Sequence, residues 1–326
     1  MKVLCIGEVM RDITLRLDEA KILKDGNVPY LSFEYGQKLQ VQKTFQSTGG
    51  SAANVAVGLS RLGIDTALTA TLGNDLVASE MVDDLHKERL DTGFIHRSDN
   101  FQTKLAVILS AGEGDRTILV YHGSANFSEE LLDAGVLRRF DFIYLGPLPE
   151  SSEGLINKVV CAVKERNLGL IVNPGFNQLK LGLETNKEII RNSLLYVLNK
   201  EEAEKLLEKN NPENDTKKLV QEISSIGAKN VVITLGKKGS LSFDGEKMIE
   251  AGIYPVKRVD ATGAGDSFLA AIAASLLFGK SLKEGVRFGT INSASVVSHY
   301  GAQTGLLHRG ELEKLVREAK IEIKEI

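Results

Sequence analysis

The sequence predicts an α/β protein with a three-layer α/β/α fold, a mostly parallel central sheet and a small β-sheet lid. Three observations predict this fold class. A short apolar run opens the chain, and similar runs alternate with helical patterns through its C-terminal two-thirds, as buried parallel strands and their crossover helices do. Two other regions alternate polar and apolar residues, which is typical of strands covered on one face only.

The first part of the chain predicts one buried strand, two half-covered strands and a helix. Residues 3–7 form a continuous apolar run that ends in glycine, so they predict a central strand. Residues 13–17 and 38–42 alternate in polarity and predict strands with one covered face. Residues 51–62 predict a helix.

The middle of the chain predicts a hairpin, and the rest predicts the parallel sheet. Two alternating segments, 105–109 and 117–121, flank a Gly-rich turn at 112–115. Further buried strands are predicted at 142–145, 170–172, 194–198 and 230–234. We therefore expect a large domain of residues 1–12, 48–96 and 122–326, with residues 13–47 and 97–121 as a β lid across the carboxyl edge of its sheet.

Composition limits the possible functions. With 43% hydrophobic and 25% charged residues, the 326-residue chain is typical of a globular protein with a sizeable core. A net charge of −3 provides no basic surface for nucleic acid. The longest apolar stretches, such as residues 268–278, are shorter than a membrane span.

The N-terminus and the cysteines indicate a cytoplasmic protein. Glu8 stands where the apolar stretch of a signal peptide would have to continue. We expect Cys5, in a strand, and Cys161, in a helix, to be reduced core thiols. The five histidines lack zinc-ligand spacing, so we expect no transition metal held by the protein.

Ligands of parallel sheets bind at the carboxyl ends of the strands, and the segment 260–266 is the first candidate there. Its Thr-Gly-Ala-Gly core lets backbone N–H groups approach an anion, and the helix that follows adds a partial positive charge. Asp266 lies in the first turn of that helix. An anion-binding turn beside a carboxylate is the pair that phosphoryl transfer needs. The alternative is an acidic helix start after a glycine turn.

Three more segments follow predicted strands or open helices. Gly49 and Gly50 allow a tight turn, and the amide of Asn54 one turn later suits substrate hydroxyls, unless this is a plain loop-to-helix junction. Residues 234–239 form either a nucleotide-binding turn or a β-hairpin. At 199–202, Asn199 and Glu202 form either a capping box or part of a Mg²⁺ and phosphate site.

The segments 49–63 and 260–266, in this order and about 200 residues apart, resemble the two signatures of the ribokinase-like (PfkB) carbohydrate kinase family. The resemblance covers nearly the whole chain, since residues 199–202, 234–239 and 301–303 also match family positions. It implies the ribokinase-like fold. It also implies an ATP-dependent sugar kinase that transfers the γ-phosphoryl group to a hydroxyl, which we expect to be primary.

The resemblance also implies roles for individual residues. Asp266 would be the general base, and the N–H groups of Gly263, Ala264 and Gly265 would form the anion hole. Glu202 would hold the Mg²⁺ of ATP through water. The substrate-binding residues implied are Asp12, Gly49, Gly50 and Asn54. The nucleotide-binding residues implied are Asn199, Thr234, Gly236, Gly239, Gly265 and Asn292.

Departures from the family pattern leave the substrate open. Ser51-Ala52 stands where true ribokinases usually carry Lys-Gly or a close variant, and Glu150 is displaced from the position of the sugar-reading glutamate. Ribose, fructose, a 2-keto-3-deoxy sugar acid and a nucleoside all remain. The alternatives are a nucleoside kinase of the same fold and a catalytically silent sugar-binding regulatory protein.

Two expectations concern a cation and a second subunit. Carbonyls behind the anion-hole turn, with the Asp260 carboxylate and the segment 301–304, could bind K⁺. Against this, Gly305 stands where some K⁺-dependent relatives carry a hydroxyl residue, and Asp260 could instead hydrogen-bond its own turn. The half-covered strands of the lid predict a homodimer that forms through the lid.

Overall fold

The structure is a computed structural model, and it describes residues 1–26, 28–111, 116–123, 132, 134–149, 152–209 and 215–326. The predicted turn at 112–115 and the residue Glu150 therefore lie outside the described residues.

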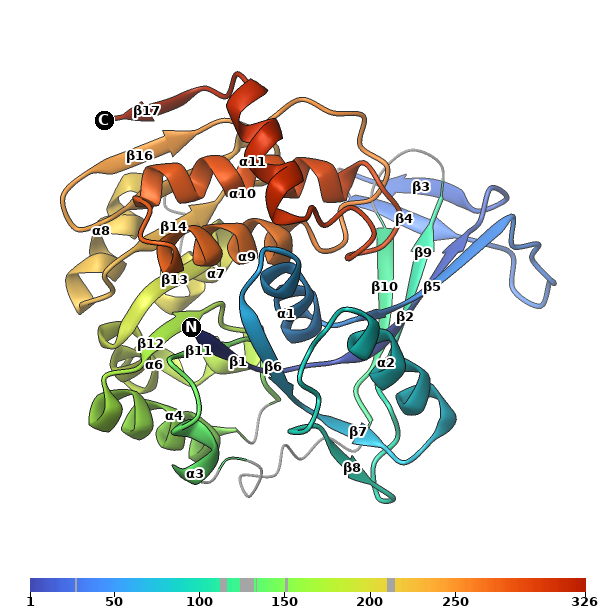
Figure 1. Cartoon of the computed structure of the whole chain (residues 1–326). Helices are drawn as coiled ribbons and strands as arrows, with labels where there is room; N and C mark the ends of the chain where they lie inside the picture. Colours follow the sequence, from blue (N-terminus) through green and yellow to red (C-terminus); the bar gives the residue numbers. More distant parts are fainter. Residues whose placement is uncertain (27, 112–115, 124–131, 133, 150–151, 210–214) are drawn as a thin grey trace.

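A large mixed sheet forms the centre of the molecule (Figure 1). Among the described residues it has nine strands, in the order β17-β16-β15-β14-β13-β12-β11-β1-β6. The strands from β6 through β14 run parallel, and β15, β16 and β17 are antiparallel. The bounds are β1 (Lys2–Ile6), β6 (Asp65–Thr69), β11 (Phe142–Leu145), β12 (Gly169–Val172), β13 (Ser193–Asn199), β14 (Val231–Thr234), β15 (Ser240–Phe243), β16 (Met248–Ala251) and β17 (Ile323–Glu325). The predicted, mostly parallel sheet is confirmed.

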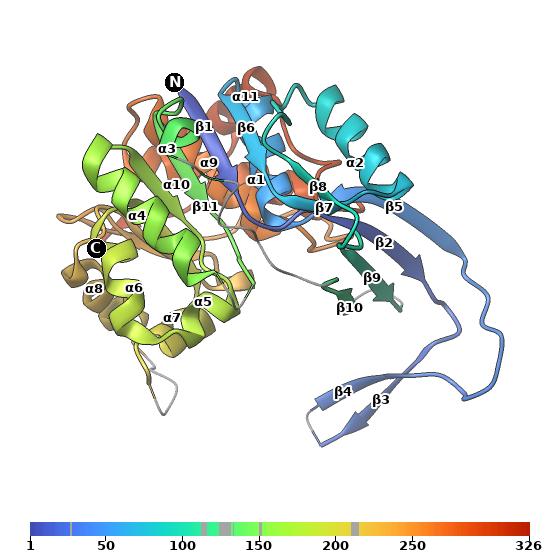
Figure 2. The same cartoon turned by 90° about the horizontal axis from the view of Figure 1, so that it is seen from below.

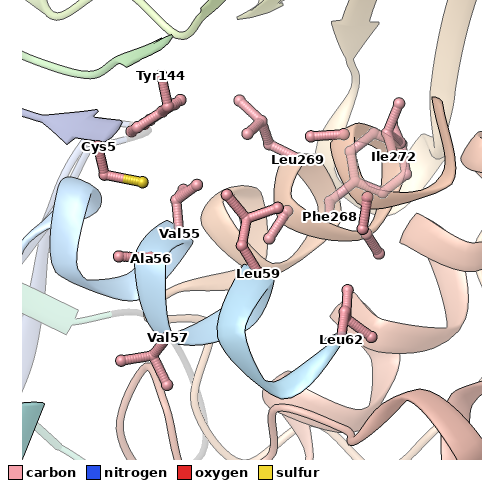
Figure 3. Packing of buried hydrophobic residues seen from close by; sticks show 14 of the residues in the cluster. Cys5, Val55, Ala56, Val57, Leu59, Leu62, Tyr144, Phe268, Leu269 and Ile272 are labelled. Carbon is pink, nitrogen blue, oxygen red and sulfur yellow. The ribbon is translucent and has the colours of Figure 1, made fainter. Parts of the chain in front are cut away.

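Helices cover both faces of this sheet and enclose two separate cores. One core includes α1 (Ser51–Arg61), α2 (Leu76–Lys87), α9 (Ala264–Leu277), α10 (Leu282–Val297) and α11 (Arg309–Glu318). The other includes α3 (Ala134–Leu137), α4 (Glu153–Arg166), α5 (Phe176–Lys180), α6 (Gly182–Arg191), α7 (Lys200–Leu206) and α8 (Thr216–Ile226). Successive residues of a strand face opposite sides of the sheet, so each strand contributes to both cores. Tyr144 of β11 lies in the first core, and Tyr196 of β13 lies in the second. Figure 3 shows Tyr144 and Cys5 above α1.

A second sheet lies across one edge of the central sheet (Figure 2). Its strands, in order, are β10 (Arg116–Tyr121), β9 (Leu105–Ser110), β2 (Met10–Arg16) and β5 (Lys43–Gly49). We call these four strands the lid sheet. The hairpin of β3 (Lys21–Asp25) and β4 (Val28–Ser32) projects beyond it, and β7 (Thr71–Gly73) pairs with β8 (His96–Ser98).

Two expectations about local structure were wrong. Residues 38–42 are not a strand, because β2 ends at Arg16 and its partner β5 begins only at Lys43. Cys161 is exposed, because it lies on the outer face of α4, whose buried residues include Val159, Val160 and Val163. Cys5 is buried, as predicted. Within the described part of the chain, none of the helices combines the length and the apolar character that a membrane crossing requires.

Candidate active site

Two helix starts bring Asp266 together with polar residues from far away in the sequence. Gly263 precedes α9 with φ 77°, and Asp266 follows in the first turn. Gly50 precedes α1 with φ 93°, which places Ser51 and Asn54 in its first turn. Ser51 Oγ donates to Asp266 Oδ1 at 2.7 Å, and Asn54 Nδ2 donates to Asp266 Oδ2 at 2.8 Å. Both carboxylate oxygens are therefore held by donors from α1.

The pKa of Asp266 reflects two opposing effects. Burial raises it, while the hydrogen bonds from Asn54 and Ser51 lower it, and the net direction is upward. A carboxylate with a raised pKa is a better proton acceptor than an ordinary aspartate. Two donors on Asp266 leave lone pairs for a substrate proton, because an ionised carboxylate offers about four acceptor positions.

The predicted contact between the segment 301–304 and the glycine-rich turn is present. Gln303 Nε2 donates to Asn54 Oδ1 at 3.0 Å, and Gly301 N donates to Asp260 Oδ2 at 3.1 Å. Asn54 thus links Gln303 to Asp266. The sequence did not indicate that Asn54 and Asp266 are hydrogen-bond partners.

Asp12 lies on β2 at the same edge and is buried. Its pKa is raised to about 7, mainly by desolvation and further by the negative charges of Asp266 and Asp260, while Arg11 opposes the shift. The three carboxylates therefore share one region, and Asp12 titrates near neutrality.

The turn before α9 is tightly built on one side and open on the other. A Cβ on Gly263 would lie 2.5 Å from Ala302 Cβ, whereas a Cβ on Gly265 would meet nothing within 4 Å. The N–H of Ala264 donates to the Ala261 carbonyl at 3.3 Å, while Gly265 belongs to the first helical turn, whose N–H groups have no intrahelical partner. The free side of the turn is thus the side of Gly265.

Asp260 anchors the same turn from behind. Its Oδ1 accepts from Thr262 N at 2.9 Å and from Thr262 Oγ1 at 2.7 Å, so it does bond its own turn. Arg116 Nε of the lid sheet lies 4.0 Å from Asp260 Oδ1 and is buried without a hydrogen-bond partner in the described structure. A hollow between the lid sheet and Asp260 is lined by Thr14, Ile108, Ser110, Arg116, Val259, Asp260 and Tyr300.

Asn199 and Glu202 form the capping box that the sequence left as an alternative. Glu202 N donates to Asn199 Oδ1 and Asn199 N donates to Glu202 Oε2, both at 2.8 Å. Burial raises the pKa of Glu202, and the bond from Asn199 opposes the shift. One carboxylate oxygen of Glu202 therefore has a backbone partner, which leaves Oε1 for a ligand or its water.

The segment 234–239 begins at the last residue of β14 and leads into the antiparallel strand β15, so the hairpin is present. A Cβ on Gly239 would lie 1.9 Å from the Ala251 carbonyl oxygen, whereas one on Gly236 would meet nothing within 4 Å. Thr234 Oγ1 donates to the Leu198 carbonyl at 3.4 Å. Gly239 is thus required for the close packing of the hairpin against Ala251, whereas the space beside Gly236 is open.

Asn292 occupies a different place from the one expected of a nucleotide ligand. It is fully buried in α10, its Nδ2 donates to the Ser267 carbonyl at 2.9 Å, and its Oδ1 accepts from Leu307 N at 3.1 Å. With both ends of the amide engaged, Asn292 joins α9 to the segment before α11. Asn292 has no exposed surface, which argues against a direct contact with nucleotide.

Sequence reasoning did not single out two residues near the site. Tyr144 was part of an apolar strand, yet its hydroxyl lies 3.0 Å from Ser51 Oγ. Arg116 was part of a hairpin strand, yet it faces Asp260. A polar tip near the carboxyl end of a buried strand was the available signal for Tyr144. The sequence held no such signal for Arg116, because its approach to Asp260 depends on how the lid sheet folds over the large sheet.

Comparison with known proteins gives a consistent result. Residues 1–309 match the model of the pfkB family carbohydrate kinases. A ribokinase of Staphylococcus aureus is 29% identical, with 83% of this chain and 89% of that protein covered. An ATP-dependent 6-phosphofructokinase of Thermoanaerobacterium thermosaccharolyticum is 25% identical over 84% of this chain and 86% of that protein.

Solved structures show the same fold. The structure of Arabidopsis thaliana ribokinase complexed with ribose and ATP superposes with a TM-score of 0.78 at 24% identity, covering 97% of this chain and 98% of that one. A nucleoside kinase of Methanocaldococcus jannaschii, described as an archaeal member of the ribokinase family, gives a TM-score of 0.77 at 20% identity over 98% of both chains.

Proposed function

Because the chain belongs to the pfkB family of carbohydrate kinases, we propose that it transfers the γ-phosphoryl group of ATP to a primary hydroxyl of a sugar or sugar-like substrate. The observation that carries this proposal is the pair formed by Asp266 and the turn before it. A carboxylate held by two donors lies beside an N-terminal helix turn with an open side. One part accepts the hydroxyl proton, and the other faces the phosphoryl charge.

The substrate hydroxyl gives its proton to the Asp266 carboxylate while the hydroxyl oxygen forms a bond to the γ-phosphorus. The bond between that phosphorus and the β,γ-bridging oxygen breaks, and ADP leaves. The N–H groups of Gly263 and Gly265 face the charge on the transferring group, and the Ala264 N–H joins them if its 3.3 Å bond to Ala261 opens. Asp12, Gly49, Gly50 and Asn54 orient the substrate.

The nucleotide and its Mg²⁺ are assigned to the neighbouring strand ends. Asn199 and Thr234 are the last residues of β13 and β14, and Gly236 and Gly239 follow β14. Glu202 fits a metal held through water, because Oε1 lacks the backbone bond that Oε2 has and oxygen is the ligand that Mg²⁺ prefers. Mg²⁺ neutralises charge on the phosphates when it is bound.

The substrate class is tested by ADP release with a panel of acceptors. The panel contains ribose, fructose, fructose 6-phosphate, a 2-keto-3-deoxy sugar acid, adenosine and inosine, each with MgATP. Preferred turnover of a sugar or sugar derivative supports the proposal. Preferred turnover of adenosine or inosine shows a nucleoside kinase of the same fold instead. The absence of ADP release with every acceptor, together with a melting-point increase with a sugar, indicates a silent sugar-binding protein.

We also propose that K⁺ binds behind the anion-hole turn, with Asp260 as a ligand. The support is a buried carboxylate held against the segment 301–304 by Gly301 N. Arg116 provides the alternative, since its guanidinium already faces Asp260. Turnover at fixed ionic strength is compared in KCl, NaCl and tetramethylammonium chloride. Several-fold activation by K⁺ that weakens in Asp260→Ala supports the site, and equal rates in all three salts contradict it.

The lid and the compartment complete the proposal. Residues 13–47 and 97–121 act as a lid over the substrate and as the surface that binds a second copy of the chain. Two free cysteines, of which Cys161 is exposed, suit the reducing cytoplasm.

A further inference from the structure

A chain of two hydroxyl groups leads from the interior of the protein to Asp266. Ser51 Oγ lies 2.7 Å from Asp266 Oδ1 and 3.0 Å from the Tyr144 hydroxyl. Tyr144 has no exposed surface and belongs to the core shared by β11, α1 and α9 (Figure 3). Three different elements thus contribute to one hydrogen-bonded row.

Chemistry fixes the direction of these bonds. An ionised carboxylate can only accept, so Ser51 must use its single proton to donate to Asp266. The remaining contact of Ser51 is then an acceptor contact, and Tyr144 must donate to it. A row of bonds that point the same way strengthens each member. The donation from Tyr144 therefore strengthens the bond from Ser51 to Asp266.

Burial makes this row costly to interrupt. A tyrosine hydroxyl inside a core needs a hydrogen-bond partner, and among the described residues Tyr144 finds it in Ser51. Tyr196 shows the contrast: it is equally buried, lies two strands away on the other face, and its hydroxyl has no partner in the described structure. The row to Asp266 is therefore a specific arrangement and not a general property of the buried tyrosines in this sheet.

We propose that Ser51 and Tyr144 are positioning residues, which together hold Oδ1 of Asp266 so that the carboxylate keeps one orientation while it takes the substrate proton. The proposal rests on the role of Asp266 as the general base. Asn54 holds Oδ2 independently. Loss of the Ser51 hydroxyl therefore leaves the carboxylate held through Oδ2 alone, whereas loss of the Tyr144 hydroxyl only weakens the hold on Oδ1.

The proposal predicts a direction for the pH dependence. A hydrogen bond to the ionised form lowers the pKa of a carboxyl group, so removing the Ser51 hydroxyl raises the pKa of Asp266. The other titratable groups nearby are Asp12 on β2, whose pKa responds to Asp266, and Glu202 and Cys5, which influence Tyr144. All of these stay unchanged in the variants used.

The test compares Ser51→Ala and Tyr144→Phe with the wild type, and Tyr196→Phe is the matched control. The first readout is the pH profile of kcat/KM with MgATP and the acceptor that the panel turns over best. The second needs no substrate: the Asp266 carboxyl carbon is titrated by ¹³C NMR in the full chain and identified by its absence from Asp266→Asn. Circular dichroism and thermal melting confirm that each variant folds.

We expect the acid limb of the kcat/KM profile and the midpoint of the NMR titration to move to higher pH. The shift should be on the order of one pH unit in Ser51→Ala and smaller in Tyr144→Phe. Tyr196→Phe should match the wild type in both. Unchanged titration in Ser51→Ala or Tyr144→Phe overturns the proposal, as does an equal shift in Tyr196→Phe. If Asp266→Asn retains turnover, the function proposed for Asp266 fails instead, and the NMR titration still decides whether the two hydroxyls act on it.

Discussion

Gly49 of β5 approaches Asp12 of β2 so closely that a Cβ on Gly49 would lie 2.0 Å from Asp12 Oδ2. The same Cβ would lie 2.5 Å from the carboxyl carbon of Asp12, so the clash would involve the carboxylate group. Gly49 therefore leaves the space that the carboxylate occupies. In the substrate site that we propose, the glycine would allow this position and the aspartate would supply the acceptor.

Gly49→Ala should displace the Asp12 carboxylate and raise KM for the hydroxylated substrate far more than KM for ATP. Asp12→Ala removes the carboxylate outright and should act in the same direction. Loss of a hydrogen bond to a charged group costs about 1.5–3 kcal/mol, or roughly 10–150-fold. Steady-state kinetics with each substrate varied in turn measure both constants. An equal rise in the two KM values would remove Asp12 from the substrate site.

Asp12→Asn should stabilise the protein more at pH 8 than at pH 5. The folded pKa of Asp12 is raised from 3.8 to about 7. Between these values the folded state holds a proton that the unfolded state has lost, so the stability of the wild type falls as pH rises through this window. The asparagine avoids this loss, which is at most roughly 4 kcal/mol. Thermal melts of both proteins at the two pH values check this, and a melting-point difference independent of pH would contradict it.

Gly263→Ala and Gly265→Ala should separate folding from catalysis. Gly263 has a positive φ and no room for a Cβ beside Ala302, so its alanine variant should lose stability and turnover together. Gly265 has open space, so its alanine variant should melt near the wild-type temperature yet turn over much more slowly, because the methyl group would stand where the phosphoryl group approaches. Melting curves and kcat are measured for both. Full turnover in Gly265→Ala would place the phosphoryl group elsewhere.

The lid surface should pair two copies of the chain. On β10, Ile118, Leu119, Val120 and Tyr121 are exposed, and the β3–β4 hairpin exposes further apolar side chains, including Ile22, Leu23, Val28 and Tyr30. Exposed apolar surface of this kind tends to be covered by a partner. Light scattering at micromolar concentration should give about twice the 35.5 kDa chain mass, and Leu119→Lys should lower it. A 35.5 kDa species in the wild type would refute the dimer.

The sequence was informative where a local pattern determines the structure. Continuous apolar runs indicated the parallel strands, because strands buried on both faces have no polar side. Asp266 was placed correctly in a first helical turn, because the glycine turn before it is a local signal. The capping box of Asn199 and Glu202 was also visible as a local spacing.

The sequence was less informative where structure depends on distant partners. Residues 38–42 alternate like a strand, but a strand forms only where another strand pairs with it. The link from Tyr144 through Ser51 to Asp266 joins three elements, and only their packing brings them together. Asn54 matched a substrate ligand by motif, while its first partner in the folded chain is Asp266.

The role of Asp266 as the general base is the central claim, and Asp266→Asn tests it most directly. The amide has nearly the same shape but cannot take the substrate proton, so kcat should fall by on the order of 10²–10⁴-fold. Affinity for ATP, measured by calorimetry on the same preparation, should stay close to that of the wild type. Retention of more than about a third of wild-type kcat would contradict the account.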